Sequence, residues 1–321
     1  MKLRQLEYFL AVVENGSFSR ASAELHVAQP ALSQQVRKLE QELGVELLTR
    51  GPRGGVANER GKILALDTRQ LLYDLERMGD RVRGPDSQPK GRVSLGIPST
   101  LNTVLGVPLI ERVKRELPLV SLNVVESMSG YILKMLRDGG LDLALVCHIE
   151  HLPGFSIRKV LIEDLYFIAP PDLRLARRRG SGAAPGTIEF ADLEQFEYTL
   201  PGRPHGLRAL IKRSAQQTGV RLRITTDVDA LTQIKRLVSR GVGCSILSHA
   251  AVADELQAGS LSALRIVKPS VQRLTSIAHR ADRPLLRAAN EVRSHTLAAI
   301  RALVLSDDWR AQLLTEGEAD R

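Results

Sequence analysis

Polar side chains that can donate or accept hydrogen bonds gather on one side of the segment QPALSQQVRKLEQEL, residues 29–43. At about 100° per residue, the apolar positions form one stripe, which consists of Leu32, Val36, Leu39 and Leu43. The opposite side carries Pro30, Ser33, Gln34, Arg37 and Gln41. Serine, glutamine and arginine near the start of a helix suit contact with base edges and phosphates in a major groove. The alternative interpretation is an ordinary solvated face.

Two shorter helices and a turn are expected to hold this segment in place. The apolar spacing of residues 6–13 predicts a first helix that ends at Asn15-Gly16. Ser17 or Ser19 can cap a second short helix, and residues 27–29 then lead to Pro30, which suits the first position of a helix. Helix, short turn and helix is the geometry that inserts a polar helix face into a major groove.

A hairpin with a cationic turn is expected next, over VELLTRGPRGGVANERG (45–61). Its Gly- and Pro-rich turn carries Arg50 and Arg53, which could reach phosphates or a narrow minor groove. We therefore expect residues 1–59 to form a winged helix-turn-helix domain that binds DNA.

A long helix is predicted over NERGKILALDTRQLLYDLERMGDRVRG (58–84). Its heptad positions are Leu64, Thr68, Leu71, Leu75, Met78 and Val82. This seam could pack on its own domain, but pairing of two chains is favoured, because a small winged domain offers little surface to cover it. Residues 60–91 are thus expected to form a linker and dimerisation helix with a hinge, since residues 83–91 hold two prolines and two glycines.

Strands and helices alternate from Val93 to Cys147 and again from Glu197 to Ser248, which predicts parallel sheets covered by helices. Two passages of chain, 160–170 and 264–279, join these halves. Two crossings indicate a hinged α/β module with a cleft. We expect it to span residues 92–304, with lobe I over 92–163 and 269–304, lobe II over 164–268, and a C-terminal tail over 305–321 for which no function is inferred.

Three helices of this module begin at small polar or flexible residues, where free backbone N–H groups favour an anion such as a carboxylate. Ser99, Thr100 and Ser129 are the candidate ligands in one lobe. Pro201 and His205 are the candidates in the other lobe. Taken singly, each serine or threonine could be an ordinary helix cap. The basic runs RLARRRGSG and IKR (211–213) of the second lobe are interpreted as a solvated loop and a helix face.

Composition and the absence of further motifs limit the classes of protein that the chain could belong to. The 321 residues carry a net charge of +9, which favours a polyanionic partner. Two cysteines, Cys147 and Cys244, exclude a disulfide framework, and their apolar settings favour packing over a redox switch. We find no signal peptide or bilayer-crossing run, so a cytoplasmic protein without a membrane partner is expected. The motif CHIEH (147–151) lacks a second ligand pair, and no nucleophile–base pair or cofactor fingerprint is found, so neither metal, cofactor nor enzymatic activity is expected.

The N-terminal run from Leu3 to Gly54 closely resembles the winged helix-turn-helix of LysR-type transcriptional regulators, above all from Ala21 to Arg50. The visible departure is Leu48, where the family usually has phenylalanine, an apolar exchange that leaves the interpretation intact. The resemblance implies that Gln29, Pro30, Ser33, Gln34 and Arg37 lie on the recognition helix and Arg53 at the tip of the wing. Stretches such as GIPST and LPGRPHGLR are similar to the nitrogen-assimilation control subgroup.

The resemblance also implies the partners and the architecture of the second half. It implies an effector domain similar to type-2 periplasmic binding proteins, a small organic acid as effector, and double-stranded promoter DNA as target. It further implies a homodimer through the linker helix, a homotetramer, and contact with RNA polymerase. The alternative from another class is a small-molecule binding protein or enzyme with an incidental helix-turn-helix.

Overall fold

The computed structural model describes the chain apart from residues 52–53, 85–86, 150, 174–183, 203–205 and 316–321. The chain divides into two compact units, Met1–Ser87 and Gln88–Arg321. Among the described residues, we find no helix whose length and apolar character would let it cross a bilayer.

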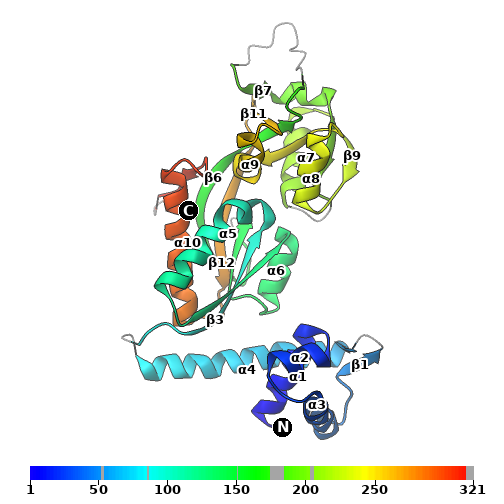
Figure 1. Cartoon of the computed structure of the whole chain (residues 1–321), viewed down its shortest axis with the longest axis vertical. Coiled ribbons are helices and arrows are strands. Elements are labelled where there is room, and N and C mark those ends of the chain that lie inside the picture. Colours follow the sequence, from blue (N-terminus) through cyan, green and yellow to red (C-terminus); the bar gives the residue numbers. More distant parts are fainter. Residues whose placement is uncertain (52–53, 85–86, 150, 174–183, 203–205, 316–321) are drawn as a thin grey trace. The chain divides into compact units, whose positions relative to one another are not determined.

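The first unit consists of three helices, a hairpin and a long helix (Figure 1). They are α1 (Leu3–Asn15), α2 (Phe18–Glu24), α3 (Gln29–Leu43), β1 (Leu48–Gly51), β2 (Gly54–Ala57) and α4 (Glu59–Arg83). Gly16 ends α1 with φ +60°, a conformation that glycine adopts without strain. The Ser17 hydroxyl accepts from the backbone N–H of Arg20 and so caps α2. These features confirm the predicted order of the elements.

Two details of α3 differ from the predictions. Pro30 is the second helical residue rather than the first, because the helix already begins at Gln29. Leu32, Val36 and Leu39 are at most 1% exposed, but Leu43 is 39% exposed. The reason is that Leu43 is the last residue of the helix: Gly44, with φ +68°, turns the chain there, so no further turn of helix covers the leucine side chain.

The long helix α4 packs on the other elements of the first unit mainly over its first half, and Leu72 and Tyr73 extend the covered part into its middle. Gly61 lies so close to the hairpin that a Cβ atom would stand 2.1 Å from the carbonyl oxygen of Leu47. Ala65 and Thr68 are also buried. The second half exposes Leu71, and Met78 and Val82 beyond it are 56% and 87% exposed. The predicted seam is therefore buried at Thr68 and half-buried at Leu75, whereas its members Leu71, Met78 and Val82 are exposed.

Two long strands organise the second unit, where β6 (Phe155–Ala169) and β12 (Gln272–Arg280) run antiparallel through its main sheet (Figure 1). The order of strands along this sheet is β4-β3-β5-β12-β6-β11-β7, and β10 also pairs with β6. The described residues form two main hydrophobic cores on either side of these crossing strands. We call the part of the second unit around each of these two cores a lobe, lobe I and lobe II.

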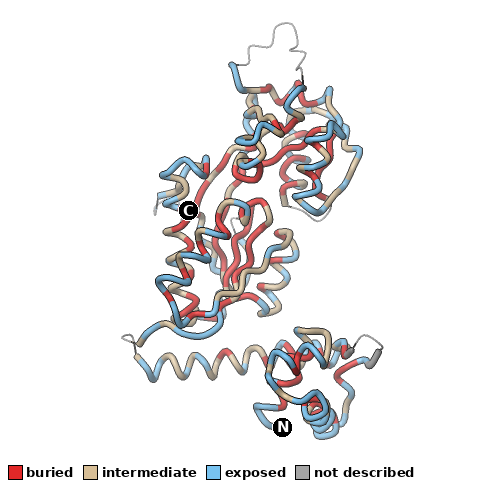
Figure 2. The backbone as a smooth tube through the Cα atoms, in the orientation of Figure 1, coloured by how far each residue is buried: buried red, intermediate tan, exposed pale blue. Residues whose placement is uncertain are grey.

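Lobe I surrounds the core that includes Leu95, Leu105, Leu145 and Val292. Its elements are β3 (Gly91–Pro98), α5 (Ser99–Glu116), β4 (Val120–Ser127), α6 (Ser129–Arg137), β5 (Leu143–Cys147) and α10 (Arg287–Leu305). The strand β3 lies parallel to both β4 and β5, as the alternating pattern predicts. The strand β5 is buried throughout and β3 over most of its length, whereas β4 is mostly half-buried (Figure 2).

Lobe II surrounds the core between Leu165 and Val271. Its elements are β7 (Thr187–Glu189), η1 (Phe190–Gln195), β8 (Glu197–Leu200), α7 (Gly206–Thr218), β9 (Arg223–Asp227), α8 (Leu231–Ser239), β10 (Ser245–Ser248), η2 (His249–Val252), α9 (Ala253–Gln257) and β11 (Ser262–Val267). The strands β8 and β9 form a separate parallel pair.

The sheets are mixed rather than purely parallel, which corrects the prediction. The chain leaves lobe I along β6 and returns to it along β12. The strand β12 therefore runs antiparallel to both β5 and β6. The C-terminal residues also add structure that the sequence did not indicate. Trp309 is fully buried against the core of lobe I, and β13 (Gln312–Leu313) pairs with β6.

Candidate functional site

The outward face of α3 presents polar side chains to solvent. Gln29, Pro30, Gln34 and Arg37 are exposed and Ser33 is half-buried, on the side opposite the buried stripe. The Gln29 side-chain oxygen accepts a hydrogen bond from the Ser19 hydroxyl at 2.9 Å, which joins the start of α3 to α2. Arg53, the predicted wing residue, lies outside the described residues.

The acidic side chains of α3 are engaged elsewhere, which leaves its outward face cationic. Glu40 is buried, and one carboxylate oxygen accepts from the backbone N–H groups of Leu47 and Leu48 at 2.9 and 3.3 Å. Glu42 pairs with the N-terminal ammonium of Met1, whose hydrogen bond lowers the pKa of that carboxyl. Among the described residues, no acidic side chain therefore pairs with Arg37 on the outward side. The sequence does not indicate this role of Glu40, because the backbone N–H groups that donate to its carboxylate belong to residues seven and eight positions further along the chain.

A cavity of about 620 Å³ lies between the two lobes of the second unit. Its lining residues are Ser129, Gly130, Leu133, Cys147, His148, Ile149, Gly206, Arg208, Ala209, Lys212 and Arg213. The first six belong to lobe I, and the other five belong to α7 of lobe II. None of these residues is acidic, whereas three are permanently cationic.

The charge in the cavity is not balanced by the described residues around it. Arg208 donates to Asp227 at 3.0 Å, which neutralises one of the three cations. Lys212 and Arg213 have no ion pair with a described residue. Opposite them, Ser129 and Gly130 begin α6, whose cap residue Met128 supplies no side-chain acceptor for the first N–H groups. The arrangement can hold an anion between a helix N-terminus and two cations.

The remaining predicted ligands are not among the residues that line this cavity. Thr100 is 4% exposed, and its hydroxyl accepts from the Arg273 guanidinium at 2.7 Å. Ser99 is half-buried and Pro201 is buried. His205 lies outside the described residues. Among the predicted effector ligands, the structure thus places only Ser129 in the described cavity wall.

An ion pair between Glu163 and Arg273, each 1% exposed at its side chain, lies where the crossing strands pair. Arg273 donates to Glu163 Oε1 from Nε at 2.9 Å and from Nη2 at 2.6 Å. Burial opposes charge on the guanidinium, but the carboxylate of Glu163 offsets that effect and the pKa of Arg273 is raised. Sequence reasoning missed this pair. The sequence does not single it out, because each crossing segment holds more than one charged residue: Glu163 and Asp164 in 160–170, and Arg265, Lys268 and Arg273 in 264–279.

The two cysteines are buried and lie in different lobes. Burial raises the pKa of Cys147, and it raises the pKa of Cys244 to about 12. Thiols of this kind hold little thiolate at neutral pH and react slowly with oxidants. Within the described part of the chain, no three of His, Cys, Asp and Glu converge as metal ligands.

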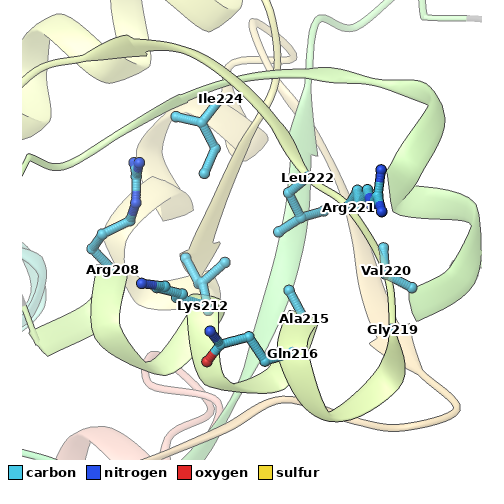
Figure 3. Close-up of a pocket in the computed structure, with 10 residues that line it drawn as sticks. Arg208, Lys212, Ala215, Gln216, Gly219, Val220, Arg221, Leu222 and Ile224 are labelled. Atoms are coloured by element: carbon cyan, nitrogen blue, oxygen red, sulfur yellow. The ribbon is translucent and has the colours of Figure 1, made fainter.

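A second, smaller cavity of about 370 Å³ lies on lobe II between α7 and the segment that leads into β9 (Figure 3). Its floor is apolar, with Ala215, Val220 and Leu222. Arg208 and Lys212 line this cavity as well as the interlobe cavity, so one helix contributes to both.

Two family models match the chain. The model described as bacterial regulatory helix-turn-helix protein, lysR family, matches residues 3–62, and the model described as LysR substrate binding domain matches residues 86–301. The nitrogen assimilation regulatory protein nac of Klebsiella aerogenes is 29% identical, over 94% of this chain and 95% of that protein. The transcriptional regulator BbuR of Bordetella bronchiseptica is 28% identical, over 95% of this chain and 91% of that protein.

Solved structures resemble the whole chain. Full-length CbnR complexed with its target DNA is 26% identical and aligns with a TM-score of 0.63, over 94% of this chain and 99% of that one. A full-length OxyR variant from Pseudomonas aeruginosa aligns with a TM-score of 0.75 over 98% of both chains. At 22% identity, the latter likeness shows the fold alone.

Proposed function

The chain belongs to the LysR family of DNA-binding transcriptional regulators with an effector-binding domain, and from this premise we propose which of its surfaces read DNA and hold the effector. The observation that carries the proposal is the outward face of α3, whose acids are engaged elsewhere while Arg37 points to solvent. An alternative function as an enzyme or binding protein with an incidental helix-turn-helix is not favoured, because the relatives named above are regulators over nearly their full length.

We propose that α3 enters the major groove of promoter DNA. Gln29, Ser33 and Gln34 would contact base edges, Pro30 would bring the start of the helix close to the groove, and Arg37 would contact a base or a phosphate. Arg53 would contact the DNA backbone beside the groove. The similarity to CbnR, whose structure was solved in complex with its target DNA, supports the binding of DNA by this chain.

The exposed apolar row on the second half of α4 supports a homodimer. Leu71, Met78 and Val82 are exposed on one side of the helix, and an apolar row of this kind is normally buried against a partner. Two paired chains would read two half-sites of a dyad-symmetric promoter. We propose that such dimers form a homotetramer on DNA in the cytoplasm, where RNA polymerase is a further partner.

We propose that the effector is a small organic acid in the interlobe cavity. The free N–H groups at the start of α6 would bind one carboxylate, and Lys212 and Arg213 would attract the anion from the other lobe. Leu133, Ile149 and Ala209 offer apolar contacts to the carbon skeleton. An acid that contacts both lobes can bind one arrangement of the lobes more tightly than another. Only such a difference in affinity between the two arrangements can alter DNA binding.

Removing the two cavity cations tests the effector site. A panel of mono- and dicarboxylates is screened by thermal shift against wild type and against Lys212→Gln/Arg213→Gln. An acid at about 100 times its Kd raises wild-type stability by about 2.7 kcal/mol, and the variant should lose most of this gain. Arg236→Gln, an exposed arginine on α8 of the same lobe, is the matched control and should respond like wild type. If wild type and the double variant responded equally to every acid that binds, the cavity assignment would be wrong.

A further inference from the structure

The C-terminal residues 306–315 are bonded to the crossing strand β6, although the matched family models end at residue 301. Trp309 is fully buried, and its indole Nε1 donates to Glu163 Oε2 at 3.1 Å. After it, β13 pairs with β6 opposite Leu161 and Ile162, and the Leu314 N–H donates to the Val160 carbonyl at 2.9 Å. The segment is thus joined to β6 by both side-chain and backbone bonds.

The carboxylate that Trp309 contacts is the centre of a buried network that reaches both lobes. Glu163 Oε1 accepts from Arg273, while Oε2 accepts from Trp309. The same guanidinium donates from Nη1 to Thr100 Oγ1 at 2.7 Å and from Nη2 to Ser248 Oγ at 3.0 Å. Thr100 lies at the start of α5 in lobe I, whereas Ser248 ends β10 in lobe II.

The orientation of Arg273 therefore depends on that of Glu163, and the orientation of Glu163 depends on Trp309. A buried carboxylate is strongly favoured in the rotamer that gives both oxygens donors. The indole N–H supplies the donor for Oε2, which leaves Oε1 facing the guanidinium. A fixed guanidinium plane in turn holds Thr100 and Ser248 at set positions, because its N–H groups have a rigid fork geometry.

We propose that Trp309 is a positioning residue for the interlobe cleft: the C-terminal segment holds the Glu163–Arg273 pair that ties Thr100 of lobe I to Ser248 of lobe II. The tie sets the resting separation of the lobes and hence access to the cavity between them. Its role in effector response rests on the proposed function, whereas the tie itself does not require any ligand.

Distance measurements between the lobes of the full-length protein test the tie without ligand. Nitroxide labels are placed at Lys134→Cys on α6 and Gln217→Cys on α7, both exposed, and labelled chains are diluted with unlabelled protein. Wild type without added cysteines, treated in the same way, gives the background from Cys147 and Cys244. Trp309→Phe keeps the aromatic ring but removes the N–H donor. We expect its interlobe distance distribution to be broader than that of the parent and displaced from it.

Two serines on one strand supply a matched pair of further variants. Ser248→Ala removes the lobe II end of the tie and should broaden the distribution as Trp309→Phe does. Ser245→Ala is equally buried, but its hydroxyl donates to the Thr199 carbonyl within lobe II, so it should leave the distribution unchanged. If Trp309→Phe lowered the melting temperature but kept the parental distribution, Trp309 would have a packing role only and the proposal would be overturned. A failed effector screen would leave this result unaffected.

Discussion

Replacing Arg273 by methionine is expected to destabilise the second unit by about 3–5 kcal/mol, because it leaves the carboxylate of Glu163 buried without its cationic partner. For a unit of this size, about 2–4 °C of melting temperature is lost per kcal/mol, so the transition should fall by roughly 6–20 °C. Differential scanning calorimetry of the full-length protein measures this change.

Two further variants show whether the loss comes from the buried pair. Arg265→Met removes an arginine whose side chain is 51% exposed and which pairs with Asp164 at 3.4 Å. Its loss should cost at most about 1 kcal/mol, because an exposed pair is screened by solvent. Arg273→Met combined with Glu163→Leu should recover much of the stability, since no unpaired charge remains. Equal losses for Arg273→Met and Arg265→Met would show that the pair is not buried as described.

Polar substitutions in the exposed apolar row of α4 are expected to separate the dimer. In Leu71→Gln/Met78→Gln, two apolar side chains of the proposed interface are replaced by neutral helix formers, which removes the hydrophobic contribution to pairing. Analytical ultracentrifugation should detect monomers. Because linked half-site contacts multiply affinity by about 10²–10⁴, binding to a two-half-site DNA should weaken by up to that factor.

A change on the opposite side of the same helix is the control for this prediction. Glu76→Gln alters an exposed residue that does not lie on the apolar row, and it should remain a dimer with wild-type DNA affinity. Should the double variant sediment as wild type does, the exposed row on α4 would not be the dimer interface.

Local pattern was sufficient to predict α3, because a buried stripe and a polar side follow directly from 3.6 residues per turn. Leu32, Val36 and Leu39 are buried as the spacing predicts. Leu43 fits the same spacing, but periodicity does not indicate where the helix stops or which residues cover its last turn. The family resemblance is confirmed by the models that match residues 3–62 and 86–301.

The cleft was less predictable, because its residues meet through tertiary structure. Arg273 and Thr100 are 173 positions apart, and nothing in the sequence near Thr100 indicates that its hydroxyl is already engaged. Lys212 was interpreted as part of a solvated helix face, yet it also lines the cavity between the lobes. Trp309 lies in a polar stretch without periodicity, so neither its burial nor the strand after it could be inferred.

We expect α3 to read DNA sequence, and a salt series on specific and scrambled DNA is the direct test of this role. Full-length wild type should bind a fragment from its own upstream region about 10³–10⁷ times more tightly than a scrambled fragment at physiological salt. Ser33→Ala and Arg37→Ala should each lose about 1–3 kcal/mol on the specific fragment, roughly 5- to 150-fold in affinity. Arg240→Ala, which removes an exposed charge from the second unit, should change neither value. Equal binding of specific and scrambled DNA at every salt concentration would contradict the account.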